Sequence, residues 1–200
     1  MKKNVFLGLL VILLVFSFFG CGDDSNENKE FTVTFELEGG NINGNNSSLQ
    51  IIVKSEEVIT KIPEPIKNNG YLNGWFSEKN GVGNEFTLST KVLSNQIVYA
   101  NWINPFIGEW NQYIGENDDD NDKFIFFEDM TCLYNLNNNP YFKGTYYFIG
   151  SKIIIIFTHN WDSIVGEWRD DDITIEFKFI IIDDNQIKVE DDYIISLWEK

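Results

Sequence analysis

Apolar and polar residues alternate with a period of two along much of this chain, and that period restricts the possible folds. In residues 31–38 every odd position is Phe, Val or Leu, and every even position is Thr or Glu. In residues 173–181 every odd position is Ile or Phe. Side chains two residues apart lie on the same face of a β-strand, so each segment predicts a strand with one buried face. We therefore expect a mainly β protein.

The segment that follows residue 30 contains several β-forming runs separated by turn residues. Strands are expected at residues 31–38, 49–53 and 96–102, with turns at Gly39-Gly40 and Asn43-Gly44. Pro63 and Pro65 exclude a regular helix or a central strand between the second and third of these strands. Residues 70–76 and a loop then lead to the last strand.

Several motifs in residues 31–102 occur together in one order. They are Phe-Thr-Val-Thr-Phe-x3-Gly-Gly, a Pro-containing middle, Gly-Tyr-x2-Gly-Trp-Phe and Val-Tyr-Ala-Asn-Trp. This segment resembles one copy of the Listeria–Bacteroides repeat, the internalin B-repeat type. The resemblance implies a β-grasp-like fold, in which a small sheet curls over one short connecting element. It also implies a module of bacterial surface proteins that serves attachment or spacing and has no catalytic residues.

The large aromatic residues of this segment have two interpretations. Tyr71, Trp75 and Trp102 can fill a core that is too small to be built from aliphatic side chains alone. They could instead form a platform for a sugar. Because they belong to the motifs of the fold, we favour the core interpretation.

The second half of the chain begins after Asn104-Pro105 and reads as one short strand after another. The expected strands are 108–114, 123–128, 131–135, 141–149, 152–158, 163–169, 173–182, 186–190 and 193–198. The expected turns are 118–122, 137–140, 150–151, 170–172, 183–185 and 191–192. Eight or nine strands at such spacing, without a helical period, predict an up-and-down antiparallel sheet that closes into a barrel.

Residues 106–200 also resemble a lipocalin-like domain. Gly108-Glu109-Trp110 is similar to the Gly-x-Trp start of such barrels, and a Phe-rich strand and the Gly144-Thr145-Tyr146 region follow. The resemblance implies a cup for a small apolar ligand. A barrel this short can instead be filled by its own side chains, and we favour a filled interior.

The N-terminus has the pattern of an export signal. Two lysines precede a run of 15 residues, 5–19, that is apolar except at two positions, which is short for a membrane-spanning helix. Gly20-Cys21 then resembles the lipobox of bacterial lipoproteins, with Phe18 where that family usually has an aliphatic residue. The resemblance implies removal of residues 1–20 and acylation of Cys21. Residues 21–30 then form an acidic, solvated tether.

The charge of the chain excludes some classes of partner. Without residues 1–20, thirteen basic residues face thirty-one acidic residues, which gives a net charge of −18. Residues 103–200 hold seven of the basic and twenty of the acidic residues, a net charge of −13. Such a field repels nucleic acid and anionic lipid, so any hold on a membrane must come from acyl chains.

Few residues suggest chemistry, and we expect no enzyme, no cofactor and no metal. With Cys21 acylated, Cys132 has no cysteine partner and lies in an apolar run typical of a buried thiol, while His159 is the one histidine of the chain. The acidic run 116–122 offers Asp118, Asp120 and Asp122 as weak candidates for calcium. The run lacks the Gly and Glu that a calcium loop requires, so we interpret it as a solvated turn.

These features predict an exported, lipid-anchored protein of the bacterial envelope, at the outer membrane or cell surface. Its function would be non-enzymatic binding or adhesion to an unidentified protein or a host or matrix molecule. Two alternatives are a carrier of a small apolar ligand in the C-terminal barrel and an inhibitor of an envelope hydrolase. An internal apolar cavity would favour the carrier.

Overall fold

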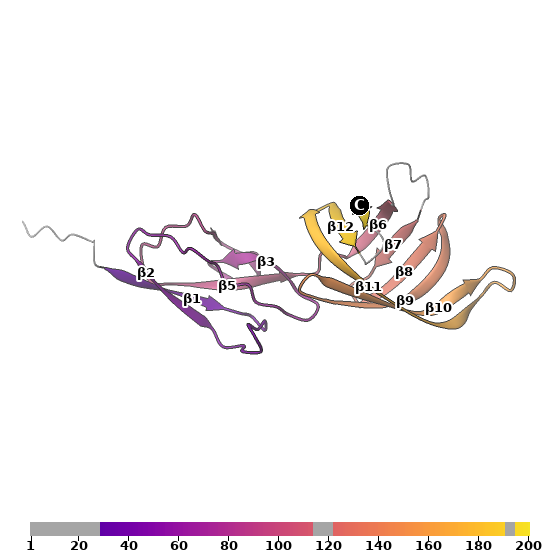
Figure 1. Cartoon of the computed structure of the whole chain (residues 1–200), viewed down its shortest axis with the longest axis horizontal. Coiled ribbons are helices and arrows are strands. Elements are labelled where there is room, and N and C mark those ends of the chain that lie inside the picture. The colour runs from indigo at the N-terminus through magenta and orange to yellow at the C-terminus, as the bar shows by residue number, and fades with distance from the viewer. Residues whose placement is uncertain (1–28, 114–121, 191–194) are drawn as a thin grey trace, which may run out of the picture.

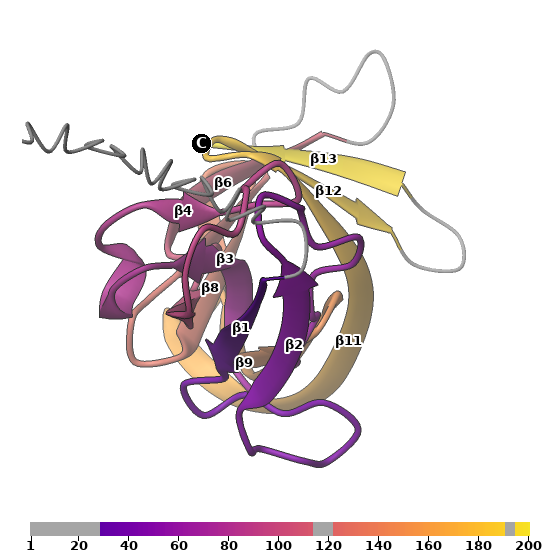
Figure 2. The same ribbon diagram turned by 90° about the vertical axis from the view of Figure 1, so that its left-hand side faces the viewer.

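The computed structural model describes residues 29–113, 122–190 and 195–200, and it contains two β units in chain order (Figure 1). Its regular structure is almost entirely strand, as the period-two pattern predicts. Across these described residues, no helix has the length and apolarity needed to cross a bilayer. Figure 2, which looks along the long axis, places the first sheet in front of the barrel.

The first unit, which we call the repeat sheet, is a mixed sheet of five strands. They are β1 (Glu30–Glu36), β2 (Leu49–Lys54), β3 (Tyr71–Phe76), β4 (Glu85–Phe86) and β5 (Gln96–Ile103). The strand order is β2-β1-β5-β3-β4, and the central pair β1 and β5 is parallel while the other pairs are antiparallel. A single 3-10 turn, η2 (Lys79–Gly81), lies between β3 and β4. This arrangement agrees with the β-grasp-like prediction, although neither β3 nor β4 was predicted as a strand.

The inward face of β1 supplies the centre of this unit. Val33 and Phe35 are fully buried, and the Phe35 ring contacts the edges of Trp75 and Phe86 with centroids 4.8 and 5.7 Å apart. Odd positions of residues 31–37 therefore face the core, as their spacing requires.

The second unit is a closed antiparallel barrel of eight strands. They are β6 (Gly108–Tyr113), β7 (Lys123–Phe126), β8 (Thr131–Leu136), β9 (Asn139–Ile149), β10 (Lys152–Asp162), β11 (Glu167–Asp183), β12 (Gln186–Glu190) and β13 (Ile195–Glu199). Each strand pairs with the next one in the chain, and β13 pairs with β6 to close the barrel. The predicted up-and-down, closing topology is confirmed.

One predicted strand and one predicted turn of the barrel are wrong. The strand expected at 163–169 does not form, because residues 163–166 are the turn between β10 and β11. Residues 170–172 were expected to separate two strands, but they lie within the 17-residue strand β11. The register changes between Phe157 and His159 of β10, where two residues of β11 lie opposite one residue of β10. Asp170 pairs with His159, and a β-bulge at Asp171 and Asp172 lets the strand continue.

The barrel interior is filled by its own side chains, with aromatic rings at its centre. Phe106 is fully buried, and its ring centroid lies 4.8 Å from that of Phe179 and 5.2 Å from that of Phe148. Trp110, also buried, donates its indole N–H to the carbonyl oxygen of Phe106. The buried core comprises Phe106, Trp110, Phe124, Phe126, Cys132, Tyr146, Phe148, Ile153, Ile155, Phe157, Phe179, Ile187, Val189 and Trp198.

The two units contact each other through polar and aromatic side chains. Asn69 and Phe148 exchange two hydrogen bonds, in which the Asn69 N–H donates to the Phe148 carbonyl (2.7 Å) and the Phe148 N–H donates to Asn69 Oδ1 (3.0 Å). Asn104 Nδ2 donates to the Tyr146 hydroxyl at 2.8 Å. The ring of Tyr71 lies 6.1 Å from that of Phe179. These contacts fix the end of the repeat sheet to the rim of the barrel.

The close approach of β9 to β10 gives the first prediction. A Cβ at Gly144 would lie 1.9 Å from the Ile156 carbonyl oxygen, so Gly144→Ala must push two paired strands apart. We expect a loss of about 3 kcal/mol in the free energy of unfolding, measured by urea denaturation. In the control Gly44→Ala, the added Cβ has nothing within 4 Å and only a left-handed backbone to tolerate, at about 1 kcal/mol. Equal losses in the two variants would contradict this packing.

A second prediction concerns the filling of the barrel. Phe106→Ala removes a fully buried ring and should cost about 3–5 kcal/mol in the same measurement. Phe127, 42% exposed, provides the matched control, and Phe127→Ala should cost less than about 1 kcal/mol. A Phe106→Ala protein as stable as the control would show that the barrel does not depend on this ring.

Candidate functional site

Several predicted site residues lie outside the described part of the chain. The proposed signal, residues 1–20, the acylation site Cys21 and most of the tether belong to residues 1–28. Asp118 and Asp120 belong to residues 114–121. These expectations therefore remain predictions.

The third calcium candidate, Asp122, is described and has a structural role. Its carboxylate accepts hydrogen bonds from the Tyr134 hydroxyl (2.8 Å) and from the Asn137 N–H (3.0 Å). It therefore ties the start of β7 to the β8–β9 turn. In the described ranges, no group of three or more His, Cys, Asp or Glu residues is placed to hold a metal ion.

Cys132 and His159 both line one shallow groove of about 340 Å³ on the barrel wall, although the sequence did not place them together. Burial raises the pKa of the Cys132 thiol to about 12, and the opposing hydrogen bond from the Gly144 backbone is the weaker influence. At neutral pH this thiol is protonated and is a poor nucleophile. His159 Nδ1 bonds instead with the Thr158 hydroxyl at 2.8 Å. The pair has the properties of a wall residue and a surface residue, not of a catalytic dyad.

The three aromatic residues weighed as a sugar platform lie in or against the cores. Trp75 is 1% exposed and donates its indole N–H to the Pro63 carbonyl at 3.2 Å. Tyr71 packs against the barrel core. Trp102 packs against the core of the repeat sheet and donates its indole N–H to the Leu37 carbonyl at 2.9 Å. The core interpretation is confirmed for Trp75 and Trp102, whereas Tyr71 packs against the core of the barrel and not against that of the repeat sheet.

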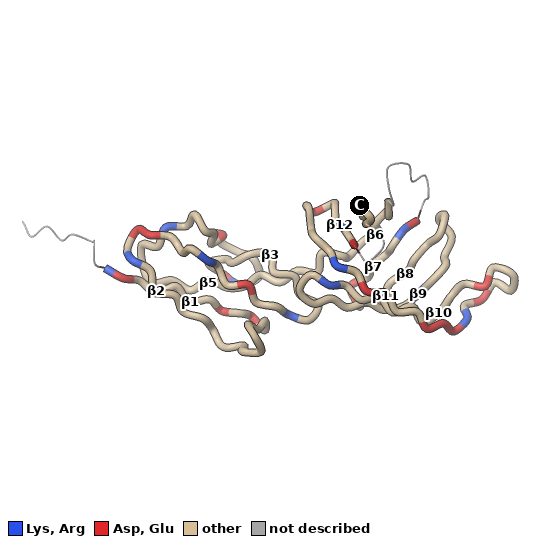
Figure 3. Tube along the Cα trace, viewed as in Figure 1, with Lys and Arg blue, Asp and Glu red and all other residues tan. Residues whose placement is uncertain are grey.

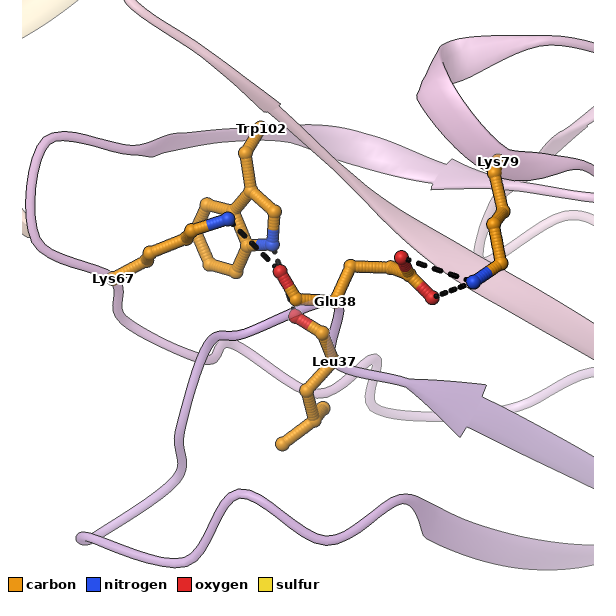
Figure 4. Close-up of polar contacts among 5 residues, drawn as sticks. All are labelled: Leu37, Glu38, Lys67, Lys79 and Trp102. Atoms are coloured by element: carbon orange, nitrogen blue, oxygen red, sulfur yellow. Dashed lines mark hydrogen bonds and ion pairs between the residues drawn. The ribbon is translucent and has the colours of Figure 1, made fainter.

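A polar cluster around Glu38 surrounds Trp102 (Figure 4). Lys67 Nζ donates to the Glu38 carbonyl oxygen at 2.9 Å and lies 5.6 Å from the Trp102 ring centroid. Lys79 forms an ion pair with the Glu38 carboxylate at 3.1 Å, and the hydrogen bond to Glu38 raises the pKa of Lys79. The ammonium groups of Lys67 and Lys79 are thus both bonded to Glu38, and the cluster closes the turn after β1.

The repeat sheet also has an open apolar groove that the sequence did not reveal. It holds about 630 Å³ between residues 60–64 and the β3–β4 edge of the sheet. Ile62, Pro63, Leu72, Phe86 and Leu88 contribute to its apolar lining. Pro63, one of the two prolines that exclude regular structure in this segment, lies in one wall of the groove. A proline-containing segment beside a sheet is the sequence signal that could have suggested the groove. Such a hollow can hold an apolar side chain or an extended segment of a partner.

The barrel interior, by contrast, offers little room for a ligand. Aromatic rings occupy it, and stacked contacts such as that of Phe124 with Trp198 (4.6 Å) fill its centre. The indole N–H of Trp198 is buried without a hydrogen-bond partner among the described residues. A cup for an apolar ligand would need an open, apolar interior instead.

Comparison with known proteins gives one finding for the repeat sheet. Residues 31–101 match the family model of the Listeria-Bacteroides repeat domain. Searches of curated proteins and of solved structures gave no match for the chain. The matched span ends within β5, so the family model covers the repeat sheet and does not extend into the barrel.

Proposed function

We propose that this chain is a lipid-anchored protein of the bacterial envelope that binds a partner and catalyses no reaction. The observation that carries the proposal is the match of residues 31–101 to a bacterial repeat domain. The resemblance of that repeat to modules of surface proteins supports attachment or spacing as its role. The N-terminal pattern, in which a basic start and an apolar run precede Gly20-Cys21, supports export and acylation.

The arrangement of the two units suits display at a distance from an anchor. The described chain begins at Lys29, beside β1, while the barrel occupies the other end of the molecule (Figure 1). An acyl anchor at Cys21 would therefore hold the repeat sheet nearer the membrane and the barrel farther from it. More than one acyl chain is needed for durable retention, because a single chain binds only marginally.

Binding, as opposed to catalysis, is supported by the properties of the described side chains. The apolar groove of the repeat sheet offers a concave surface for a partner. The Cys132 thiol is held in its protonated form by burial, and Asp122 closes a turn. Neither residue has the environment of an activated nucleophile or a metal ligand.

The anchor is tested by Cys21→Ala in full-length protein produced in bacteria. We expect the variant to lose its acyl chains and to move from the membrane to the soluble fraction, since the charge of the chain gives no alternative attraction to anionic lipid. Cys132→Ala, which changes the other cysteine, should stay with the membrane. Retention of the Cys21→Ala variant in the membrane fraction would contradict the proposed anchor.

The carrier alternative is tested by titration of the purified protein with a fluorescent fatty acid. Because side chains fill the barrel, we expect no saturable binding at one molecule per chain. The Phe106→Ala variant, in which a buried ring is removed, serves as a comparison that opens space. Tight, stoichiometric binding by the unmodified protein would favour a carrier over the proposed binding module.

A further inference from the structure

The β10–β11 hairpin forms the end of the barrel most distant from the repeat sheet (Figure 1). Its outer part pairs Asn160 with Arg169, Trp161 with Trp168, and Asp162 with Glu167. The turn at residues 163–166 lies beyond these pairs. The tip is therefore the part of the described chain that a partner approaching from the far side meets first.

The turn at the tip is held in one conformation by Asp162. Its Oδ1 accepts hydrogen bonds from the backbone N–H groups of Ile164 (2.9 Å) and Val165 (3.3 Å). The N–H of Gly166 donates to the Asp162 carbonyl at 2.8 Å, and Arg169 Nε lies 2.7 Å from Oδ2. Gly166 has φ +72°, a left-handed value that glycine adopts readily. The bonds to the two N–H groups also lower the pKa of the Asp162 carboxyl, because they favour its charged form.

The two strands below the turn are joined by aromatic side chains. Trp161 and Trp168 face each other across the hairpin with ring centroids 5.3 Å apart and planes at 68°, the favourable edge-to-face arrangement. Lys143 of β9 places its Nζ 4.8 Å from the Trp168 ring centroid. Both indoles are half-buried. These ring contacts therefore hold the two strands together as they extend from the barrel wall to the turn.

This rigid support presents aliphatic side chains to water. Ile164 is 93% exposed and Val165 is 53% exposed. A single exposed aliphatic residue is ordinary. Here, however, the Asp162 carboxylate holds the backbone of Ile164 and Val165 through two hydrogen bonds. A backbone that is already fixed loses little freedom on binding, which is a property of an interface anchor.

The negative charge around the tip indicates which class of partner the tip attracts. Residues 158–172 contain five carboxylates and one arginine, a net charge of −4, and acidic positions lie on both strands near the tip (Figure 3). A second copy of the chain would bring another acidic barrel of net charge −13 against it. Anionic lipid would be repelled for the same reason. A surface rich in Lys and Arg is attracted instead.

We propose that the tip formed by Ile164 and Val165 inserts into an apolar pocket on a cationic protein, and that the carboxylates beside it pair with the rim of that pocket. The proposal rests on the proposed binding function and assigns it to one surface of the barrel. The indoles of Trp161 and Trp168 then flank the inserted side chains, as aromatic residues commonly do at interface centres.

The test uses full-length protein on intact cells of the bacterium that makes it. A photoreactive phenylalanine derivative replaces Ile164 in one variant and Ile180 in the control, since Ile180 is also exposed (56%) and lies on β11, outside the tip. We expect irradiation to join position 164, and not position 180, to one protein of net positive charge. A lipid adduct, an adduct with a second copy, an acidic partner, equal labelling at both positions or no adduct would each overturn the proposal.

The identified protein is then purified and its affinity for full-length variants is measured. Ile164→Asp should weaken binding at least about tenfold, Ile180→Asp should change it less than about twofold, and added salt should weaken it. Unchanged binding by Ile164→Asp would refute the tip as the anchor. If the unmodified protein binds and this variant binds equally, only the tip proposal fails. If no cell-surface or secreted molecule binds the unmodified protein, the proposed binding function fails with it.

Discussion

The ring of Phe106 is the contact on which most of this structure depends. It belongs to the short link between β5 and β6, yet it is fully buried and contacts rings from β7, β9, β11 and β13. Its backbone also contributes, because its carbonyl accepts the indole N–H of Trp110 and its N–H donates to Asn104 Oδ1 at 3.1 Å. The link between the two units therefore also supplies a ring at the centre of the barrel core.

This placement joins the two units more firmly than a linker of its length alone would. Asn69 just before β3 and Asn104 just after β5, at the same end of the sheet, bond to β9 of the barrel, and Tyr71 packs against its core. A junction with directed hydrogen bonds on both sides of the link resists rotation better than an apolar contact, because each bond has a preferred direction. The proposed consequence is functional: an anchored repeat sheet would orient the barrel and hold its β10–β11 hairpin away from the membrane.

The sequence predicted the architecture well because the architecture follows from side-chain period and turn residues. The alternation in residues 31–38 and 173–181 placed the correct residues inside, and the closing barrel followed from the number and spacing of its strands. The three aspartates at 170–172 misled the prediction, since their local preference for a turn was overridden by pairing with β10 and by a bulge. Strand β4 was missed because two residues carry no period.

The candidate sites were predicted less well, for a physical reason. A groove or a protruding tip depends on which residues are brought together across the sheet, and period and composition do not contain that information. The apolar groove combines residues 60–64 with side chains of β3 and β4, and the turn at Asp162 depends on two backbone N–H groups and Arg169. The aromatic residues were the exception, because Trp75 and Trp102 belong to motifs that define the fold of the repeat.

The hydrogen bonds of Asn69 and Asn104 to β9 should hold the repeat sheet and the barrel in one orientation. The most direct measurement is the distance distribution between spin labels on Ile52→Cys of β2 and Ile164→Cys at the hairpin tip, both exposed positions, while Cys132 is buried. We expect a single narrow distribution of the distance between the labels, which broadens when Asn69 and Asn104 are both replaced by Ala. A broad or two-peaked distribution in the protein that keeps both asparagines would contradict it.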